Sequence, residues 1–230
     1  MLKLLSLFLL FSLTSASVEA KSKKVLYIGD SQSAGYLGNI VYNELLKTYK
    51  ADQVDVFGIS SSSPRHWGDA KSSKNGTWLC GRKGRHNEKF PIPLKSKICN
   101  GKSNQAAFDY LLSQKYDHVF IQFLGNSVAF KESYIKNKVS QLVSFLDKEK
   151  CVFITTPPHY YTLAENNQKR IKVESYFIEA INGRCKVVRG MTDKNLKTFA
   201  KVRNHYQPDK KHLSLKGAEE FFKQFKDLLP

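Results

Sequence analysis

The chain alternates short apolar runs with longer stretches of helical periodicity, and this alternation limits its possible folds more than any other feature. Between the runs, apolar residues recur three or four positions apart, as at Leu37, Val41 and Leu45. The runs themselves are Val25–Ile28, Val54–Ile59, His118–Leu124, Val152–Thr155 and Lys186–Val188. Strands that alternate with helices favour a parallel sheet that is covered on both faces. We therefore predict an α/β fold with a five-stranded parallel sheet in the flavodoxin-like order 2-1-3-4-5.

The first twenty residues have the pattern of a secretory signal peptide. A positive start at Lys3 precedes an apolar stretch, and small residues precede a cleavage point after Ala20 or, alternatively, after Ala16. That stretch is too short to span a membrane, and no later segment approaches the roughly eighteen apolar residues that a spanning helix needs. We expect an exported protein, periplasmic or secreted, with no transmembrane segment after cleavage and with residues 21–230 forming one domain.

Four cysteines in an exported chain predict two disulfides. Three pairings are possible. We favour Cys80–Cys99, which lie in one loop region, and Cys151–Cys185, which begin two apolar runs that suit neighbouring strands. A metal site is the rival interpretation, but the sequence has no CxxC or HExxH spacing, so we expect no metal.

Residues 62–104 interrupt the alternation. They contain ten Lys or Arg residues against Asp69 and Glu88, together with both tryptophans, Trp67 and Trp78. Neither strand nor helix periodicity is visible there, and a long irregular segment in a compact domain is usually functional or disordered. We interpret this segment as a basic insertion within the domain.

The formal net charge is +17, which predicts attraction to polyanions. Export makes nucleic acid a poor candidate. Anionic glycans, cell-wall polymers or anionic lipid surfaces are better candidates, and the alternative is that the charge serves solubility alone. The sequence does not indicate an oligomeric state.

Small and polar residues occur where three of the predicted strands end. Gly29-Asp30-Ser31 follows the first strand, Gly58-Ile59-Ser60-Ser61 ends the second, and Gly125-Asn126 follows the third. Ligands of open parallel sheets bind beyond the carboxyl ends of the strands, where the strand order reverses. A hydroxyl and preorganised donors at one edge are what acyl transfer requires. The alternative is that Asp30 or Ser31 merely caps the following helix.

A candidate base lies near the end of the chain, in Pro208-Asp209-Lys210-Lys211-His212-Leu213-Ser214. A serine hydroxyl is a weak nucleophile without such a base. The three-residue spacing lets Asp209 hold the Nδ1–H of His212 while Nε2 faces a serine, and Ser214 can cap the last helix. The alternative is a surface histidine in a polar loop.

Together these motifs resemble those of the SGNH (GDSL-type) hydrolases. Gly29-Asp30-Ser31 with Gly35 is similar to the first block of that family, Gly125-Asn126 to the third and Asp209-x-x-His212 to the fifth. The resemblance implies a three-layer α/β/α domain with no metal or organic cofactor. It also implies Ser31 as nucleophile, His212 as base and then acid, Asp209 as its orienting group, and the Ser31 N–H and the Asn126 amide in the oxyanion hole.

Three positions depart from the family pattern. The second block normally carries an oxyanion-hole glycine, and the nearest alignment places Ser61 there, with Gly58 as the alternative. Ser127 stands where the third block has an aspartate. Gln32 replaces the leucine that is common after the serine, and a polar rim there suits a hydrated substrate better than an acyl chain.

Four residues are candidate substrate contacts. Gln32 and His159 follow the first and fourth strands, and Trp67 and Trp78 would either stack on sugars or form a small core within the insertion. We predict an exported serine esterase that hydrolyses a short acyl ester, O-acetyl for preference, on a carbohydrate or cell-wall polymer. The alternatives are a lysophospholipase or thioesterase, a glycan O-acetyltransferase, and a catalytically silent glycan-binding module.

Overall fold

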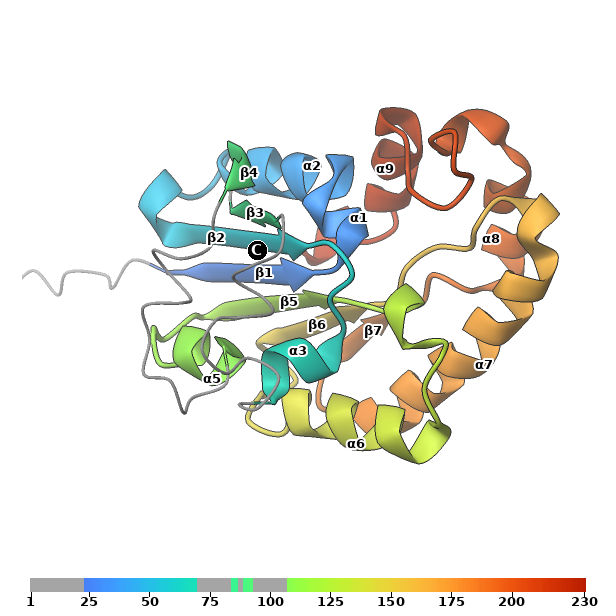
Figure 1. Cartoon of the computed structure of the whole chain (residues 1–230). Helices are drawn as coiled ribbons and strands as arrows, with labels where there is room; N and C mark the ends of the chain where they lie inside the picture. The colour runs from blue at the N-terminus through green and yellow to red at the C-terminus, as the bar shows by residue number, and fades with distance from the viewer. Residues whose placement is uncertain (1–22, 70–83, 87–88, 93–106) are drawn as a thin grey trace, which may run out of the picture.

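A seven-stranded sheet runs through the middle of the molecule (Figure 1). The computed structural model describes residues 23–69, 84–86, 89–92 and 107–230. The strands are β1 (Val25–Gly29), β2 (Val54–Ile59), β3 (Gly84–His86), β4 (Lys89–Ile92), β5 (His118–Gln122), β6 (Cys151–Ile154) and β7 (Lys186–Val188). Their order across the sheet is β4-β3-β2-β1-β5-β6-β7.

Five of these strands form the predicted parallel sheet. β1 pairs with β2 and β5, and β6 lies between β5 and β7, all in parallel register. The order 2-1-3-4-5 of the sequence prediction is therefore confirmed. β1 is buried along its whole length because helices cover both faces, which explains why such strands are nearly continuous apolar runs.

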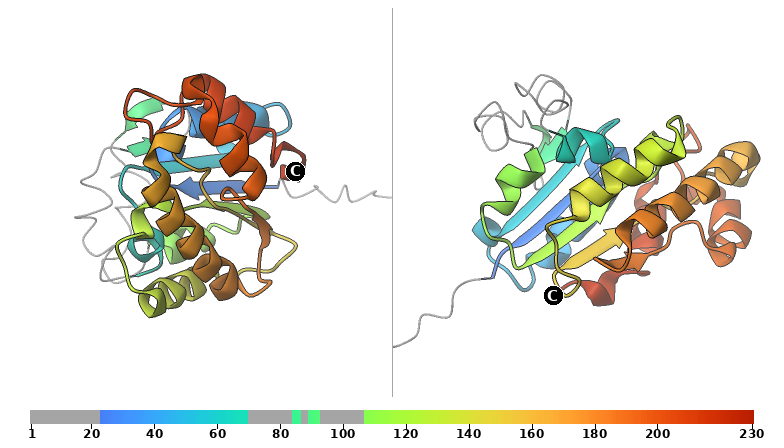
Figure 2. Two further views of the ribbon diagram at one scale, coloured as in Figure 1. Left: turned by 90° about the vertical axis from the view of Figure 1, so that its right-hand side faces the viewer. Right: turned by 90° about the horizontal axis from the view of Figure 1, so that it is seen from below.

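Helices lie on both faces of the sheet, as the two views of Figure 2 show. One apolar core lies between the sheet and the helices α2 (Tyr36–Leu45) and α9 (Leu215–Phe222). The other lies beneath α3 (Pro64–Gly68), α5 (Ala107–Leu112), α6 (Glu132–Val143) and α7 (Ala164–Ile181). Two short helices, α1 (Ser31–Ala34) and α8 (Asp193–Lys197), follow β1 and β7. Among the described residues, no helix combines the length and apolarity needed to cross a membrane.

The basic segment contains elements that periodicity did not indicate. α3 lies at its start, and β3 and β4 form an antiparallel pair that extends the sheet from β2. β3 and β4 have three and four residues, which is too short for a periodic pattern to be visible.

The prediction of Trp67 as a sugar-stacking residue is wrong. Its side chain is fully buried, with its ring centroid 6.5 Å from those of both Phe57 and Phe123. Trp67 therefore belongs to the main core. Trp78, Cys80, Cys99 and the predicted signal peptide lie outside the described residues.

The predicted Cys151–Cys185 disulfide is present. Val152 pairs with Lys186 in the parallel register of β6 and β7, so the preceding residues of both strands are also neighbours. Their Cα atoms are 4.6 Å apart. The bridge joins the amino ends of these two strands.

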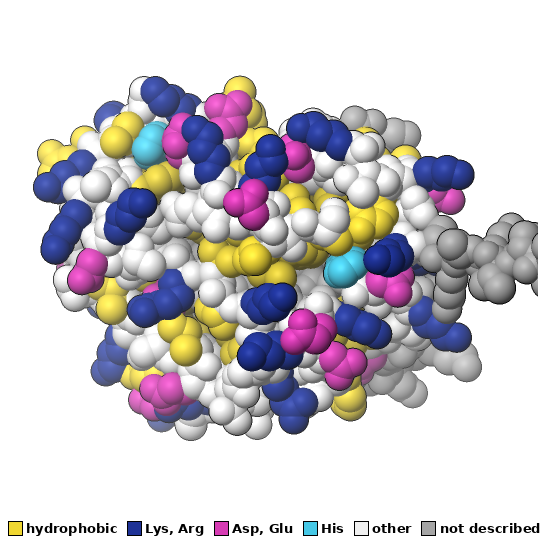
Figure 3. All heavy atoms as spheres, turned by 180° about the vertical axis from the view of Figure 1, so that it is seen from behind, with side chains coloured by type: hydrophobic (Ala, Val, Ile, Leu, Met, Phe, Trp, Pro, Cys, Tyr) yellow, Lys and Arg dark blue, Asp and Glu magenta, His cyan; other side chains and the backbone are white. Residues whose placement is uncertain are grey.

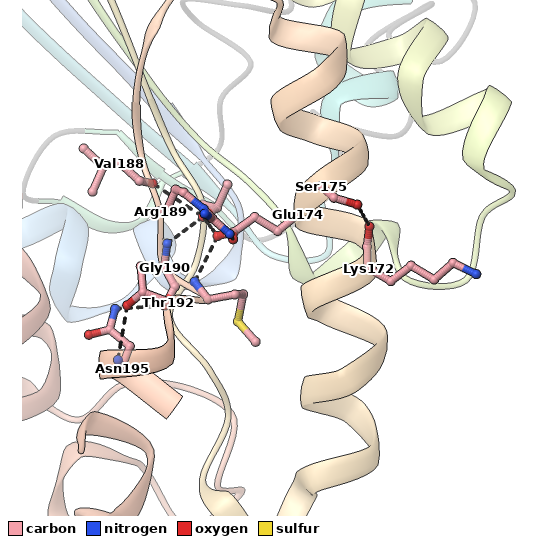
Figure 4. A network of polar contacts seen from close by, with 10 residues as sticks. Lys172, Glu174, Ser175, Val188, Arg189, Gly190, Thr192 and Asn195 are labelled. Atoms are coloured by element: carbon pink, nitrogen blue, oxygen red, sulfur yellow. Dashed lines mark hydrogen bonds and ion pairs between the residues drawn. The ribbon is translucent and has the colours of Figure 1, made fainter. Parts of the chain in front are cut away.

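At the carboxyl ends of β6 and β7, the buried Glu174 of α7 holds the following loops in place (Figure 4). Its carboxylate accepts hydrogen bonds from the Thr155 hydroxyl, the Met191 N–H and the Arg189 guanidinium. Removing a partner from such a buried charge is costly, so these contacts fix α7 against the edge where the polar motifs lie.

Candidate active site

Ser31 lies at the first position of α1, two residues after the end of β1 at Gly29. Asp30 caps this helix, since its side chain accepts a hydrogen bond of 2.9 Å from the Gln32 N–H. Close packing requires Gly29, because a Cβ atom there would lie 2.0 Å from the Ser33 hydroxyl oxygen. The turn thus leaves the Ser31 hydroxyl at the carboxyl edge of the sheet.

Asp30 is almost completely buried beneath this turn. Burial raises the pKa of its carboxyl to about 6, although the hydrogen bond from Gln32 and the positive charge of Arg170 oppose that shift.

The structure brings Ser31, His212 and Asp209 together. The Nε2 atom of His212 lies 2.9 Å from the Ser31 Oγ atom, and Asp209 contacts Nδ1 on the other side of the ring. The second carboxylate oxygen of Asp209 accepts hydrogen bonds of 2.9 and 3.0 Å from the backbone N–H groups of Lys211 and His212. Asp209 is therefore fixed by the turn that carries His212.

Partial burial acts to raise the pKa of Asp209, but its hydrogen bonds outweigh this effect. The bonds from the His212 ring and from the two backbone N–H groups lower the pKa to about 2. Asp209 is therefore an anion at neutral pH, as the orienting partner of an imidazole must be.

The side chain of Gln32 holds the loop around His212. Its amide nitrogen donates to the Lys211 carbonyl at 3.0 Å, and its amide oxygen accepts from the Leu213 N–H at 3.1 Å. Gln32 borders the hollow beside Ser31, but both polar ends of its amide are thus engaged by protein. The structure therefore gives Gln32 a positioning contact with this loop, and its part as a substrate contact stays a prediction.

Asn126 lies in the short 3₁₀ helix Gly125–Ser127 after β5, and its side chain is exposed. One amide hydrogen is used, because Nδ2 donates to the Ser62 carbonyl at 2.9 Å. The other has no acceptor among the described residues. Ser127, which replaces the family aspartate, is buried, and its N–H donates to the Leu124 carbonyl.

Ser61 has the backbone conformation that a glycine would adopt most easily, with φ at 65°. Gly58 instead lies within β2, where a Cβ atom would come within 2.2 Å of the Ser33 and Ala34 backbone. Gly58 is therefore a packing residue under α1, and its assignment to the oxyanion hole is wrong. Ser61 remains the candidate at that position.

Two hollows meet at Ser31 and His212. The first, here the Asn126 hollow, has a volume of about 290 Å³, and the second, the Tyr36 hollow, about 410 Å³. The Asn126 hollow is also bordered by Asp30, Gln32, Thr156, His159, Asn166, Arg170 and Lys211. The Tyr36 hollow is bordered by Tyr36, Asn39, Ser60 and Gln207.

His159 lies on the rim of the Asn126 hollow, where it was expected. Its backbone makes two hydrogen bonds with the side chain of Asn167, while its Nδ1 atom is buried without a partner in the described structure. Burial, together with the positive charge of Arg170, lowers the pKa of His159 to about 3. The ring is therefore neutral at neutral pH.

Arg170 is the site residue that the sequence did not indicate. It lies in a stretch with helical period, where a single arginine normally marks the solvent face. Here the side chain is only 2% exposed and borders the Asn126 hollow. Within the described part of the chain, no group of three His, Cys, Asp or Glu residues could hold a metal ion.

Solved structures share this architecture at low sequence identity. A lipase/acylhydrolase from Enterococcus faecalis is 15% identical, with a TM-score of 0.57 over 90% of this chain and 97% of that one. An acetylxylan esterase from Geobacillus stearothermophilus is 13% identical, with a TM-score of 0.55 over 89% and 93%. A protein described as an SGNH hydrolase from Slackia heliotrinireducens is 12% identical, with a TM-score of 0.52 over 91% and 100%.

No protein-family model matches the sequence, and no curated protein matches it. At such low identities the likeness to solved structures concerns the fold. The strand order and these neighbours agree with the motifs: the chain has the SGNH hydrolase fold.

Proposed function

We propose that this protein is a serine esterase that removes a short acyl group, acetyl for preference, from a carbohydrate. The observation that carries the proposal is the hydrogen-bonded series from Ser31 through His212 to Asp209, with Ser31 and His212 open to two hollows. A nucleophile, a base and an orienting carboxylate in this order are what acyl transfer through serine needs.

In the first half of the reaction, the Nε2 atom of His212 accepts the Ser31 proton as Oγ attacks the ester carbonyl. Negative charge develops on the carbonyl oxygen. The backbone N–H of Ser31 and the free amide hydrogen of Asn126 donate to that oxygen, and the N–H of Ser61 is a third candidate donor. His212 then gives its proton to the departing alcohol, which leaves the acyl group on Ser31.

In the second half, water takes the place of the alcohol. His212 removes a proton from this water, which attacks the acyl carbon, and the proton then returns to Ser31 as the acid departs. Asp209 stays ionised throughout, consistent with its pKa of about 2, and stabilises the positive charge that His212 carries transiently.

A short acyl group is favoured by the walls of the Asn126 hollow. Polar side chains such as Thr156, His159 and Asn166 border it, and Val128 is the aliphatic residue among them. A long apolar chain would leave these groups without hydrogen-bond partners. The acetylxylan esterase among the structural neighbours supports the carbohydrate part of the proposal, whereas the lipase/acylhydrolase keeps long acyl chains as the second candidate.

Export and an acidic partner belong to the same proposal. The signal-like first twenty residues and the Cys151–Cys185 disulfide support an oxidising compartment. The net charge of +17 supports a partner that carries negative charge. On the face shown in Figure 3, Lys and Arg side chains are scattered among acidic ones and form no single basic patch there.

The test is an acyl-chain series on the purified protein, with acetate, butyrate, octanoate and palmitate released from matched activated esters beside a Ser31→Ala control. We expect serine-dependent turnover that falls steeply beyond butyrate. A preference for octanoate or palmitate would support the lipase or thioesterase alternative. Absence of turnover above the Ser31→Ala level on every ester would contradict the esterase and leave a transferase or a silent binding module.

A further inference from the structure

The guanidinium of Arg170 is a buried cation with unused donors on the wall of the Asn126 hollow. Its Nη2 atom donates to the Pro157 carbonyl at 2.8 Å and to the Thr156 hydroxyl. Its Nη1 atom makes no hydrogen bond within the described residues and lies beside Gly125, 2.7 Å from where a Cβ atom would stand. Its Nε atom is buried and also lacks a partner there.

Arg170 also lacks a direct counter-ion in the described structure. Glu174, one helical turn away, forms its ion pair with Arg189. Asp30 borders the same hollow, but it acts on Arg170 only through space, and its carboxylate accepts from Gln32 instead. A buried charge without a paired and hydrogen-bonded partner is unfavourable, which is why buried arginines normally have one.

We propose that Arg170 binds a carboxylate of the substrate, next to the ester that Ser31 attacks. Arginine suits this group because its N–H donors form charge-assisted hydrogen bonds with carboxylate oxygens. Asn166, one turn earlier on α7, and Lys211 border the same hollow and add a polar group and a second positive charge. Asp30 shares the hollow, so its negative charge favours a monoanion over a doubly charged phosphate.

The inference rests on the proposed esterase activity and limits its substrates to esters that carry a carboxylate. The carboxylate has two possible sources: the acyl group, as in a succinyl ester, or the alcohol, as in an acetylated acidic sugar. Both present the same chemistry to Arg170. The Asn126 amide borders the hollow as well, so a substrate whose carbonyl oxygen is held there lies beside the Arg170 wall.

The experiment compares esters of matched shape in which a carboxamide replaces the carboxylate, with the enzyme-free hydrolysis rate of each ester subtracted. On the acyl side, the pair is the 4-nitrophenyl ester of succinate and that of succinamate; on the alcohol side, it is 4-acetoxybenzoate and 4-acetoxybenzamide. In one of the two pairs, we expect kcat/KM for the charged ester to exceed that for the neutral ester by about tenfold or more. A hydrogen bond to a charged group has an effect of about this size. In Arg170→Gln the ratio of kcat/KM for the charged ester to kcat/KM for the neutral ester should fall to about one, whatever the absolute rate of that variant.

Lys169→Gln is the matched control, because it removes one positive charge from the neighbouring position of α7, where the side chain is 57% exposed. It should keep the preference. Raising the salt concentration should leave most of the preference intact, since buried contacts are screened less than the surface field. The melting temperature of each variant shows whether the variant is folded. Arg170→Lys keeps the positive charge, so it separates loss of the charge from disruption of the loop that Arg170 holds.

Binding is measured separately, so that failure of the esterase proposal does not obscure the result. Calorimetric titration of Ser31→Ala with monomethyl succinate and with methyl succinamate should favour the carboxylate, and Ser31→Ala/Arg170→Gln should not distinguish them. Equal kcat/KM within both ester pairs, together with equal binding of these two ligands, would overturn the Arg170 assignment. An unchanged preference in folded Arg170→Gln would do the same.

Discussion

Gln32 and His212 are 180 positions apart in the sequence, yet the Gln32 amide bonds to the backbone on both sides of His212. It donates to the residue before the histidine and accepts from the residue after it. Because Gln32 directly follows Ser31, the two halves of the candidate catalytic pair share one connection. Gln32, which stands where SGNH hydrolases commonly have leucine, therefore helps to fix the distance between Ser31 and His212.

Replacing Gln32 by leucine removes this connection. We expect kcat to fall by about 10- to 100-fold, since small misplacements of reacting groups have effects of that size. KM should change little, because the Gln32 amide oxygen and one of its amide hydrogens bond to the loop around His212. Steady-state kinetics on an acetyl ester measure both constants, and the exposed Gln114→Leu serves as control. A raised KM with unchanged kcat would instead identify Gln32 as a substrate contact.

Replacing Asn126 by alanine tests the oxyanion role. Loss of one such donor typically lowers kcat by about 100- to 1000-fold, since its hydrogen bond strengthens only as charge develops. KM should therefore change much less than kcat. The exposed Asn137→Ala on α6 controls for the loss of an amide elsewhere. A fall of less than about threefold in kcat would remove Asn126 from the reaction.

Local sequence patterns were enough to predict the five parallel strands and the positions of the main motifs. Continuous apolar runs identify strands buried on both faces, and Ser31, Asn126 and His212 follow from short motifs at strand ends or before a helix. The Cys151–Cys185 pairing was accessible because it needs only two adjacent parallel strands. Each of these inferences depends on neighbours in sequence or on one rule of sheet topology.

Other features depend on packing that sequence spacing does not reveal. Trp67 lies in a basic segment, yet its side chain packs between Phe57 and Phe123. Arg170 looks like any charged residue of an amphipathic helix until α7 is placed against the ends of β5 and β6. Gly58 is required by its approach to the Ser33–Ala34 backbone, a contact that no local pattern indicates.

The burial of Asp30 makes stability depend on pH. Its folded-state pKa of about 6 lies above the ordinary value of 3.8, so the folded protein holds a proton that the unfolded chain has lost between these values. The contribution of Asp30 to stability is complete below about pH 4 and is lost as the pH rises to 6. The loss corresponds to about 3 kcal/mol in the free energy of unfolding.

Asp30→Asn should remove this dependence, because asparagine also caps helices but carries no charge. In urea unfolding experiments, the free energy of unfolding of the variant minus that of wild type should rise by about 2–3 kcal/mol from pH 3.5 to pH 7.5. The exposed Asp52→Asn should show no such gain. A constant difference between Asp30→Asn and wild type across this range would mean that Asp30 ionises as freely in the folded protein as in the unfolded chain.

The Cys151–Cys185 bridge should stabilise the fold without affecting the reaction. It closes a loop across a sequence separation of 34, for which the loss of chain entropy in the unfolded state amounts to about 4 kcal/mol. Cys151→Ala/Cys185→Ala should lower the free energy of unfolding by about that amount in urea. Because the bridge lies at the amino ends of β6 and β7, and Ser31 and His212 lie at the carboxyl edge of the sheet, kcat at 20 °C should stay within about twofold of wild type. A large fall in kcat with the double variant still folded would show that the two ends of the sheet are coupled, and an unchanged free energy of unfolding would contradict the stabilising role.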